Sequence, residues 1–98
     1  MEAKKIIITG GATRIGAAIA KSLADYETSI TIHFNTSKKE AEKVKEELQD
    51  LGSEVHLIKA DLNNQKQTEN LIKNAFKKMR GIDCLINNAS VFENDDLL

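Results

Sequence analysis

The chain has 98 residues, which is enough for one small domain. Hydrophobic residues make up 41% and charged residues 30%, a balance typical of a globular protein and not of a disordered or fibrous one. The net charge is -1 and the basic residues are dispersed, which argues against a nucleic-acid-binding surface. The single cysteine, Cys84, excludes an internal disulfide and suits a reducing cytoplasm, and the apolar run at 6–8 is far too short to span a membrane.

Apolar residues switch repeatedly between the spacing of a strand and the spacing of a helix. Residues 5–9 are largely β-branched and predict a strand buried on both faces. Ile15, Ile19 and Leu23 then recur at every fourth position, which predicts one apolar stripe of a helix. Residues 29–34 alternate between apolar and polar, so we expect a second strand there.

A second helix is predicted after residue 37. Ser37 and Glu40 have the spacing of a capping box, in which the serine side chain bonds a free N–H at the helix start. Gly52 is suited to end this helix, because glycine readily adopts the left-handed conformation of a C-terminal cap. The apolar residues at helical spacing between them are Ala41, Val44, Leu48 and Leu51.

A third strand, a third helix and a fourth strand complete the pattern. Residues 55–58 predict the third strand, which ends near Asp61, and residues 82–87 predict the fourth. The helix between them is expected to end at Gly81. Its apolar stripe consists of Leu71, Ile72, Ala75, Phe76 and Met79.

The predicted order of elements is therefore β-α-β-α-β-α-β. Strands separated by single helices favour a parallel sheet with right-handed crossovers and helices on both faces. We expect a strand order of 3-2-1-4, which is the first half of a doubly wound α/β sheet of the Rossmann type and one strand beyond its centre. Residues 1–98 would then form a single, truncated domain of the Rossmann type.

A glycine-rich segment joins the first predicted strand to the first predicted helix. Residues 9–16 read T-G-G-A-T-R-I-G. Glycine allows the backbone to turn sharply and to approach a phosphate, and the following helix presents free N–H groups and the positive end of its dipole. A tight connection without a ligand is the structural alternative. The position between a buried strand and an amphipathic helix favours phosphate binding.

The end of the second predicted strand bears on the choice of dinucleotide. NAD-binding sheets place an acidic residue about twenty residues beyond the glycines, where it holds the ribose 2′-hydroxyl. Asn35 stands there instead, followed by Thr36 and Ser37, and all three side chains donate hydrogen bonds. Arg14 and Lys38 add positive charge. These residues favour NADPH, and the structural alternative is that Ser37 only caps a helix.

Two motifs, in this order, resemble those of the short-chain dehydrogenase/reductase family over nearly the whole chain. Residues 9–16 are similar to the family's T-G-x-x-x-G-x-G turn, and residues 87–92, N-N-A-S-V-F, to its N-N-A-G motif. Arg14 replaces the middle glycine of the turn, and Ser90 replaces the last glycine of the second motif. With Phe92, these residues most resemble pteridine reductases and their dihydromonapterin (dihydrofolate) reductase relatives.

The resemblance implies a set of binding residues. Arg14 would reach the cofactor pyrophosphate and the substrate, and Asp61 would accept a hydrogen bond from the adenine amino group, with Leu62 against the base. Ser90 would touch both cofactor and substrate, and Phe92 would stack on a pterin ring. The structural alternatives are a solvated Arg14, an ordinary turn at Asp61 and a core position for Phe92. The predicted cofactor-binding residues are Gly10, Thr13, Arg14, Ile15, Gly16, Asn35, Thr36, Ser37, Asp61, Leu62, Asn88, Ala89 and Ser90.

The resemblance also implies a reaction, in which hydride passes from the nicotinamide to a carbonyl or imine-type bond. In this family a tyrosine donates the proton and a lysine four residues later lowers its pKa. The single tyrosine, Tyr26, has Ile30 at that distance, so we predict no catalytic residue and no turnover by this chain alone. No metal site is expected: His33 and His56 are predicted to be structural, and Cys84 to be a small buried hydrophobe.

Three functions remain open at this point. The chain is the amino-terminal part of an NADPH-dependent reductase, a non-catalytic NADP(H)-binding protein, or an oligomerising fragment. The reductase would be pteridine reductase-like or another kind, such as a 3-oxoacyl-carrier-protein, sugar or alcohol reductase. An unpaired edge on the fourth strand predicts a homo-oligomer. No nucleic-acid or membrane partner is expected.

Overall fold

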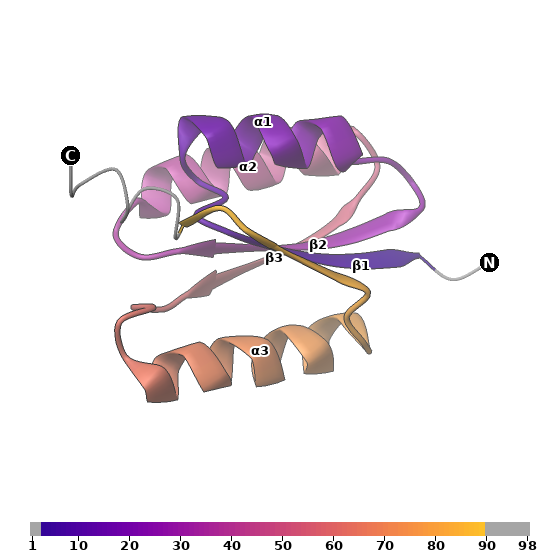
Figure 1. Ribbon diagram of the computed structural model, residues 1–98. Helices are drawn as coiled ribbons and strands as arrows, with labels where there is room; N and C mark the ends of the chain where they lie inside the picture. Colours follow the sequence, from indigo (N-terminus) through magenta and orange to yellow (C-terminus); the bar gives the residue numbers. More distant parts are fainter. Residues whose placement is uncertain (1–2, 90–98) are drawn as a thin grey trace.

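The computed structural model describes residues 3–89 and shows a parallel sheet between two layers of helices (Figure 1). The predicted alternation of strands and helices is confirmed. The strands are β1 (Lys4–Thr9), β2 (Thr28–Phe34), β3 (Glu54–Lys59) and β4 (Cys84–Asn87). The helices are α1 (Arg14–Leu23), α2 (Lys38–Asp50) and α3 (Gln65–Met79).

The four strands lie in the order β3-β2-β1-β4, as predicted, and every pair is parallel. In register, Ile8 lies beside Ile32 of β2 on one side and beside Ile86 of β4 on the other. The chain leaves β1 toward β2 and later returns to pair with the other side of β1. The carboxyl end of β1 is therefore a topological switch point, where open α/β sheets bind their ligands.

Helices α1 and α2 cover one face of the sheet, above it in Figure 1. Alternate residues of β1 and β2 point to this face, because successive side chains of a strand point to opposite sides. The buried cluster on this side consists of Ile6, Ile8, Ala20, Ile30, Ile32, Val44, Leu48 and Val55. Both helices are amphipathic and bury a narrow stripe of side chains against the strands, so their stability comes mainly from this contact.

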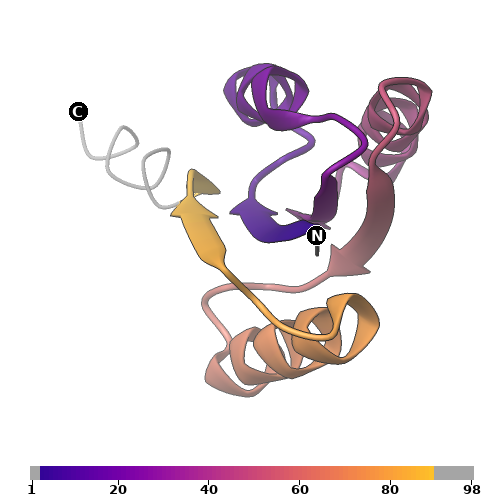
Figure 2. The ribbon, with the colours of Figure 1, turned by 90° about the vertical axis from the view of Figure 1, so that its right-hand side faces the viewer.

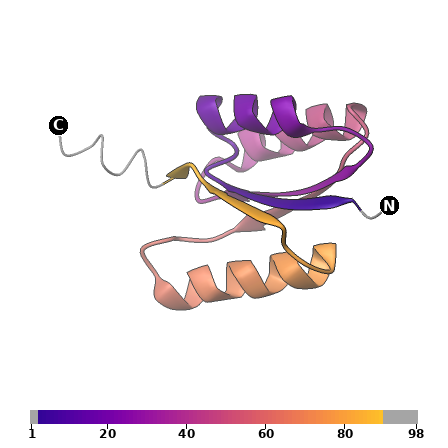
Figure 3. The same ribbon diagram turned by 45° about the vertical axis from the view of Figure 1, so that its right-hand side comes forward.

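Among the described residues, helix α3 is the element that covers the opposite face, as Figures 2 and 3 show. Ile7, the central residue of β1, is fully buried there against Ala75 and Met79. Leu71 is also buried on α3, but Phe76 is 57% exposed although it belongs to the predicted stripe. The stripe is thus narrower than its sequence spacing indicates.

Helix α2 ends as predicted but begins differently. Gly52 has φ +102°, its N–H bonds the carbonyl of Gln49, and the N–H of Ser53 bonds the carbonyl of Leu48. This pair of bonds is a Schellman motif. The predicted capping box at the other end is wrong in one respect, because the Ser37 side chain makes no cap hydrogen bond.

The fourth strand differs most from the sequence-based expectation. It runs from residue 84 to 87 and not from 82, because Asp83 uses its carboxylate and its N–H to bond the backbone of Lys5 across the start of β1. Cys84 is exposed, so the prediction of a buried cysteine is wrong. The physical reason is that β4 lies at the edge of the described sheet and packs mainly against β1.

The contrast between buried and exposed leucines near the end of α2 gives a test of this packing. Leu48 is fully buried and Leu51 is 46% exposed. We expect Leu48→Ala to lower the free energy of unfolding by about 2–5 kcal/mol, because it removes apolar contacts and leaves a cavity. We expect Leu51→Ala to change it by about 1 kcal/mol or less. Urea unfolding followed by circular dichroism measures both, and equal losses would contradict the assignment of the core.

Candidate functional site

The glycine turn between β1 and α1 is a tight crossing of backbone over backbone. Gly10 has φ +64°, a left-handed conformation that side chains disfavour. A Cβ at Gly16 would overlap the carbonyl oxygen of Gly10 and press on the Cα of Gly11. The first turn of α1 therefore lies against the end of β1 only because these positions carry no side chain.

Two polar side chains hold this turn closed. The Thr13 hydroxyl donates to the carbonyl of Gly10 at 2.7 Å and accepts from the N–H of Gly16 at 3.1 Å. The Asn88 amide, beyond the end of β4, donates to the same Gly10 carbonyl at 3.1 Å and to the Thr13 hydroxyl at 3.2 Å. The hydroxyl of Thr13 thus uses its proton and both lone pairs, which is its full hydrogen-bonding capacity.

The start of α1 leaves backbone donors free for a ligand. Gly16 and Ala17 bond to Thr13, but within residues 3–89 the N–H groups of Arg14 and Ile15 have no hydrogen-bond partner. The first turn of α1 contains no acidic residue. Free N–H groups at the positive end of a helix dipole form a site for an anion such as phosphate.

The tip of β2 faces this turn across a cavity of about 230 Å³. The cavity is lined by residues of the glycine turn, residues of the tip of β2 about twenty positions later, and Ala89. No carboxylate lines it among the described residues. The lining residues are Gly10, Ala12, Thr13, His33, Phe34, Asn35, Thr36, Ser37 and Ala89.

The predicted cofactor-binding residues do not all lie in one place. Six of them line the cavity: Gly10, Thr13, Asn35, Thr36, Ser37 and Ala89. Gly16 and Asn88 lie behind the turn and hold its shape, while the side chains of Arg14 and Ile15 are exposed at the start of α1. Ser90, and Phe92 as a predicted substrate contact, lie outside the described residues.

Asp61 and Leu62 do not line the cavity between the glycine turn and the tip of β2. The Asp61 carboxylate accepts the N–H of Asn63 at 2.9 Å, which is the local turn chemistry weighed as the alternative. Leu62 lines a second hollow, of about 240 Å³, on the α3 side of the sheet. This hollow also contains Thr9 and Leu85.

Sequence reasoning missed the part that two residues play in the site. His33 is 3% exposed, accepts the N–H of Gly10 and contacts the carbonyl of Ala60. The Thr9 hydroxyl lies 3.0 Å from Oδ1 of Asn87 and accepts the N–H of Ala89 at 3.2 Å. Strand alternation predicts which face each side chain occupies, but it carries no information on which loop will lie against that face.

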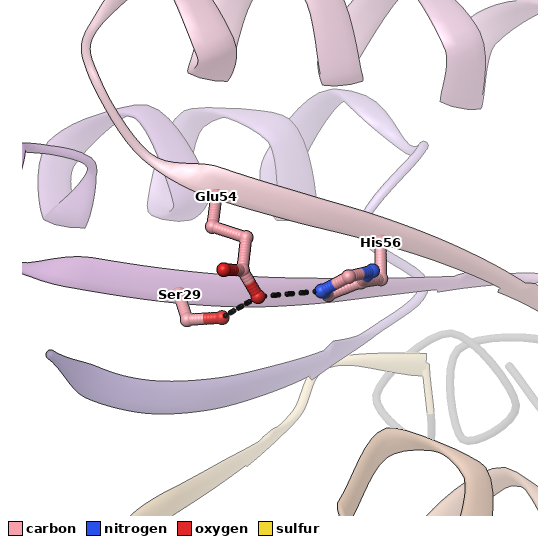
Figure 4. A network of polar contacts seen from close by, with 3 residues as sticks. All are labelled: Ser29, Glu54 and His56. Carbon is pink, nitrogen blue, oxygen red and sulfur yellow. Dashed lines mark hydrogen bonds and ion pairs between the residues drawn. The ribbon is translucent and has the colours of Figure 1, made fainter. Parts of the chain in front are cut away.

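A second polar cluster lies at the amino ends of β2 and β3, at the opposite end of the sheet from the glycine turn (Figure 4). Ser29 donates to Oε2 of Glu54 at 3.1 Å, and Nε2 of His56 lies 2.7 Å from the same oxygen. The hydrogen bond from His56 is the main cause that lowers the pKa of Glu54. Since Ser29 bonds the carboxylate and not the imidazole, the arrangement does not activate a serine nucleophile.

The part of the chain that the structure describes shows neither a candidate metal site nor a membrane-spanning helix. Residues 3–89 contain no group of three or more His, Cys, Asp or Glu side chains placed to hold a metal ion. No helix in the same range is long and apolar enough to cross a membrane.

The glycine turn and the topological switch point are both typical of dinucleotide-binding α/β sheets, and sequence comparison decides the family. Residues 4–97 match the sequence model described as short chain dehydrogenase. The chain belongs to the short-chain dehydrogenase family. It is 32% identical over 93 residues to an uncharacterized oxidoreductase of Methylorubrum extorquens. The aligned region covers 95% of this chain and 38% of that protein.

Solved structures described as a dehydrogenase and as a reductase share the fold. A dehydrogenase from Burkholderia cenocepacia with bound NADP superposes with a TM-score of 0.78 at 30% identity, over 87% of this chain and 34% of that one. An NADH-dependent reductase complexed with NAD superposes with a TM-score of 0.79 at 27% identity. The match covers 88% of this chain and 36% of that one. The chain spans only 32% to 38% of the length of the curated relatives it matches first.

The crossing at Gly16 gives a second test. We expect Gly16→Ala to lower the free energy of unfolding by about 1–3 kcal/mol, because the new methyl group overlaps backbone atoms that cannot move independently of β1. Ala18→Ser, at an exposed position of the same helix, serves as the control and should cost only about 0.5 kcal/mol. Thermal or urea unfolding measures both variants. A Gly16→Ala protein as stable as the control would show that α1 does not lie this close to β1.

Proposed function

We propose that this chain provides the amino-terminal, NADP(H)-binding part of a short-chain reductase. The observation that carries the proposal concerns residues 3–89: the backbone N–H groups of Arg14 and Ile15 have no partner among them, and no carboxylate among them lines the adjacent cavity. The cofactor's diphosphate would accept these N–H groups at the start of α1, and its adenosine ribose would lie at the tip of β2.

The tip of β2 supports NADPH over NADH as the preferred cofactor. Asn35, Thr36 and Ser37 line the cavity and donate hydrogen bonds, which suits a 2′-phosphate with its three acceptor oxygens. The Ser37 side chain makes no cap hydrogen bond, so its hydroxyl is available to such a phosphate. Arg14 and Lys38 add positive charge from the starts of α1 and α2. An NAD-specific site would need a carboxylate where Asn35 stands.

The reaction that we propose is hydride transfer from NADPH to a carbonyl or to a C=N bond of a pterin. Arg14 at the start of α1 supports a pteridine reductase-like substrate, because its side chain is exposed and makes no ion pair within the described residues. The proposed substrate contacts Ser90 and Phe92 lie outside those residues. The 98 residues include one tyrosine, Tyr26, with Ile30 four positions later, so we expect binding without turnover from this chain by itself.

A homo-oligomer is the second part of the proposal. Leu85 of β4 is 50% exposed at the edge of the described sheet, where a further strand or a second chain would cover it. An apolar, unpaired strand edge favours association. We also propose a cytoplasmic location, since the exposed thiol of Cys84 suits a reducing compartment.

The cofactor preference is tested by titration calorimetry of the chain with NADP and with NAD. We expect NADP to bind at least about tenfold more tightly, a difference of about 1.4 kcal/mol. Asn35→Asp should abolish this preference, because the new carboxylate repels a 2′-phosphate and accepts a hydrogen bond from a 2′-hydroxyl. Asn74→Asp, the same change at an exposed position of α3, should leave it intact. Equal affinities for the two nucleotides in the unaltered chain would refute the NADPH assignment.

A further inference from the structure

His33 lies at the centre of three chain segments that are distant in sequence. It is the residue before the last of β2 and is 3% exposed. Its Nδ1 lies 3.0 Å from the backbone nitrogen of Gly10 in the glycine turn, and its Nε2 lies 2.8 Å from the carbonyl oxygen of Ala60 after β3. The N–H of Gly11 also bonds the His33 carbonyl at 3.1 Å, so side chain and backbone of His33 hold the same turn.

These two partners determine the protonation state of the ring. A backbone N–H can only donate and a backbone carbonyl can only accept, so Nδ1 of His33 accepts and Nε2 carries the proton. This is the neutral tautomer. Burial of the ring lowers the pKa of His33 and favours this form, with a smaller opposing effect from the bond to Ala60. In a charged ring Nδ1 would also carry a proton, and two N–H donors, one from His33 and one from Gly10, would face each other.

The bond to His33 completes the hold on the Gly10 peptide. The carbonyl of Gly10 is already bound by the Thr13 hydroxyl and the Asn88 amide, and its N–H is bound by Nδ1 of His33 from the other side. Gly10 is itself buried and sits at φ +64°. With both of its polar groups fixed, the residue has little freedom to rotate, and the free N–H groups that begin α1 keep their direction.

We propose that His33 is a positioning residue for the dinucleotide site: its neutral imidazole, by accepting the N–H of Gly10, holds the glycine turn in its phosphate-binding shape. The effect on ligand affinity rests on the proposed function, whereas the hold on the turn does not. Without an acceptor, the buried N–H of Gly10 is unsatisfied, and a rotation of the peptide to recover a partner would also move the turn.

Three substitutions separate the bond to Gly10 from the bond to Ala60. His33→Asn retains a short acceptor near the position of Nδ1 but does not reach Ala60. His33→Gln retains a longer donor toward Ala60 but presents no acceptor at the short position. His33→Phe fills the space and removes both bonds. Each variant is examined by circular dichroism, by urea unfolding and by calorimetric titration with NADP.

We expect NADP affinity to follow the Gly10 bond and not overall stability. His33→Asn should bind NADP within about threefold of the unaltered chain, whereas His33→Gln and His33→Phe should each lose at least about tenfold. If His33 only supports the core, the losses of affinity will follow the unfolding free energies of the variants, and His33→Asn will bind NADP no better than a His33→Gln protein of equal stability. That result would overturn the proposal. The comparison of the Asn and Gln variants suffices if His33→Phe fails to fold.

Amide hydrogen exchange at Gly10, measured by NMR without nucleotide, tests the hold on the turn independently. The Gly10 amide should be protected in the unaltered chain and in His33→Asn, and should exchange at least about tenfold faster in His33→Gln and His33→Phe. If this pattern appears but NADP does not bind, the proposed function fails and the hold on the turn stands. Equal exchange in all four proteins would overturn the role of His33 even if NADP binds.

Discussion

The structure depends on one close approach of backbone to backbone, where the first turn of α1 lies against the end of β1. Gly16 allows the contact because a Cβ there would overlap the Gly10 carbonyl oxygen. Once the turn has this shape, the polar groups of Gly10 are buried and need partners, which Thr13, Asn88 and His33 supply. The same turn geometry leaves the N–H groups at the start of α1 without partners among the described residues, so they are available to a ligand.

The parallel sheet explains why these partners come from separate parts of the chain. All four strands run in the same direction, so the loops that follow them gather at the end of the sheet where the strands finish. Because β1 lies between β2 and β4, the segment after β1 receives His33 from one neighbour and Asn88 from the other. The Ser29, Glu54 and His56 cluster lies at the opposite end of the sheet, where the strands begin.

Local patterns in the sequence were sufficient for the fold but not for every environment. The switch between strand and helix periods predicted the elements and, with their order, the strand sequence 3-2-1-4. Exposure of Cys84 and Phe76 was not predictable, because both depend on which neighbours cover β4 and α3. The capping box at Ser37 failed for a similar reason: the spacing was present, but the backbone at Ser37, at φ -88° and ψ 60°, does not bring the hydroxyl to a helix N–H.

The amino-acid sequence by itself determined the alternation of elements, the glycine turn and the absence of an acid at Asn35, since each depends on residues close together in the chain. It also carried the family resemblance that the sequence comparisons confirmed. Only the tertiary structure decided that the turn and the tip of β2 line one cavity, and that His33 bonds Gly10 across 23 positions. Such contacts arise from the packing of parallel strands, which brings distant residues together without leaving a periodic signal in the sequence.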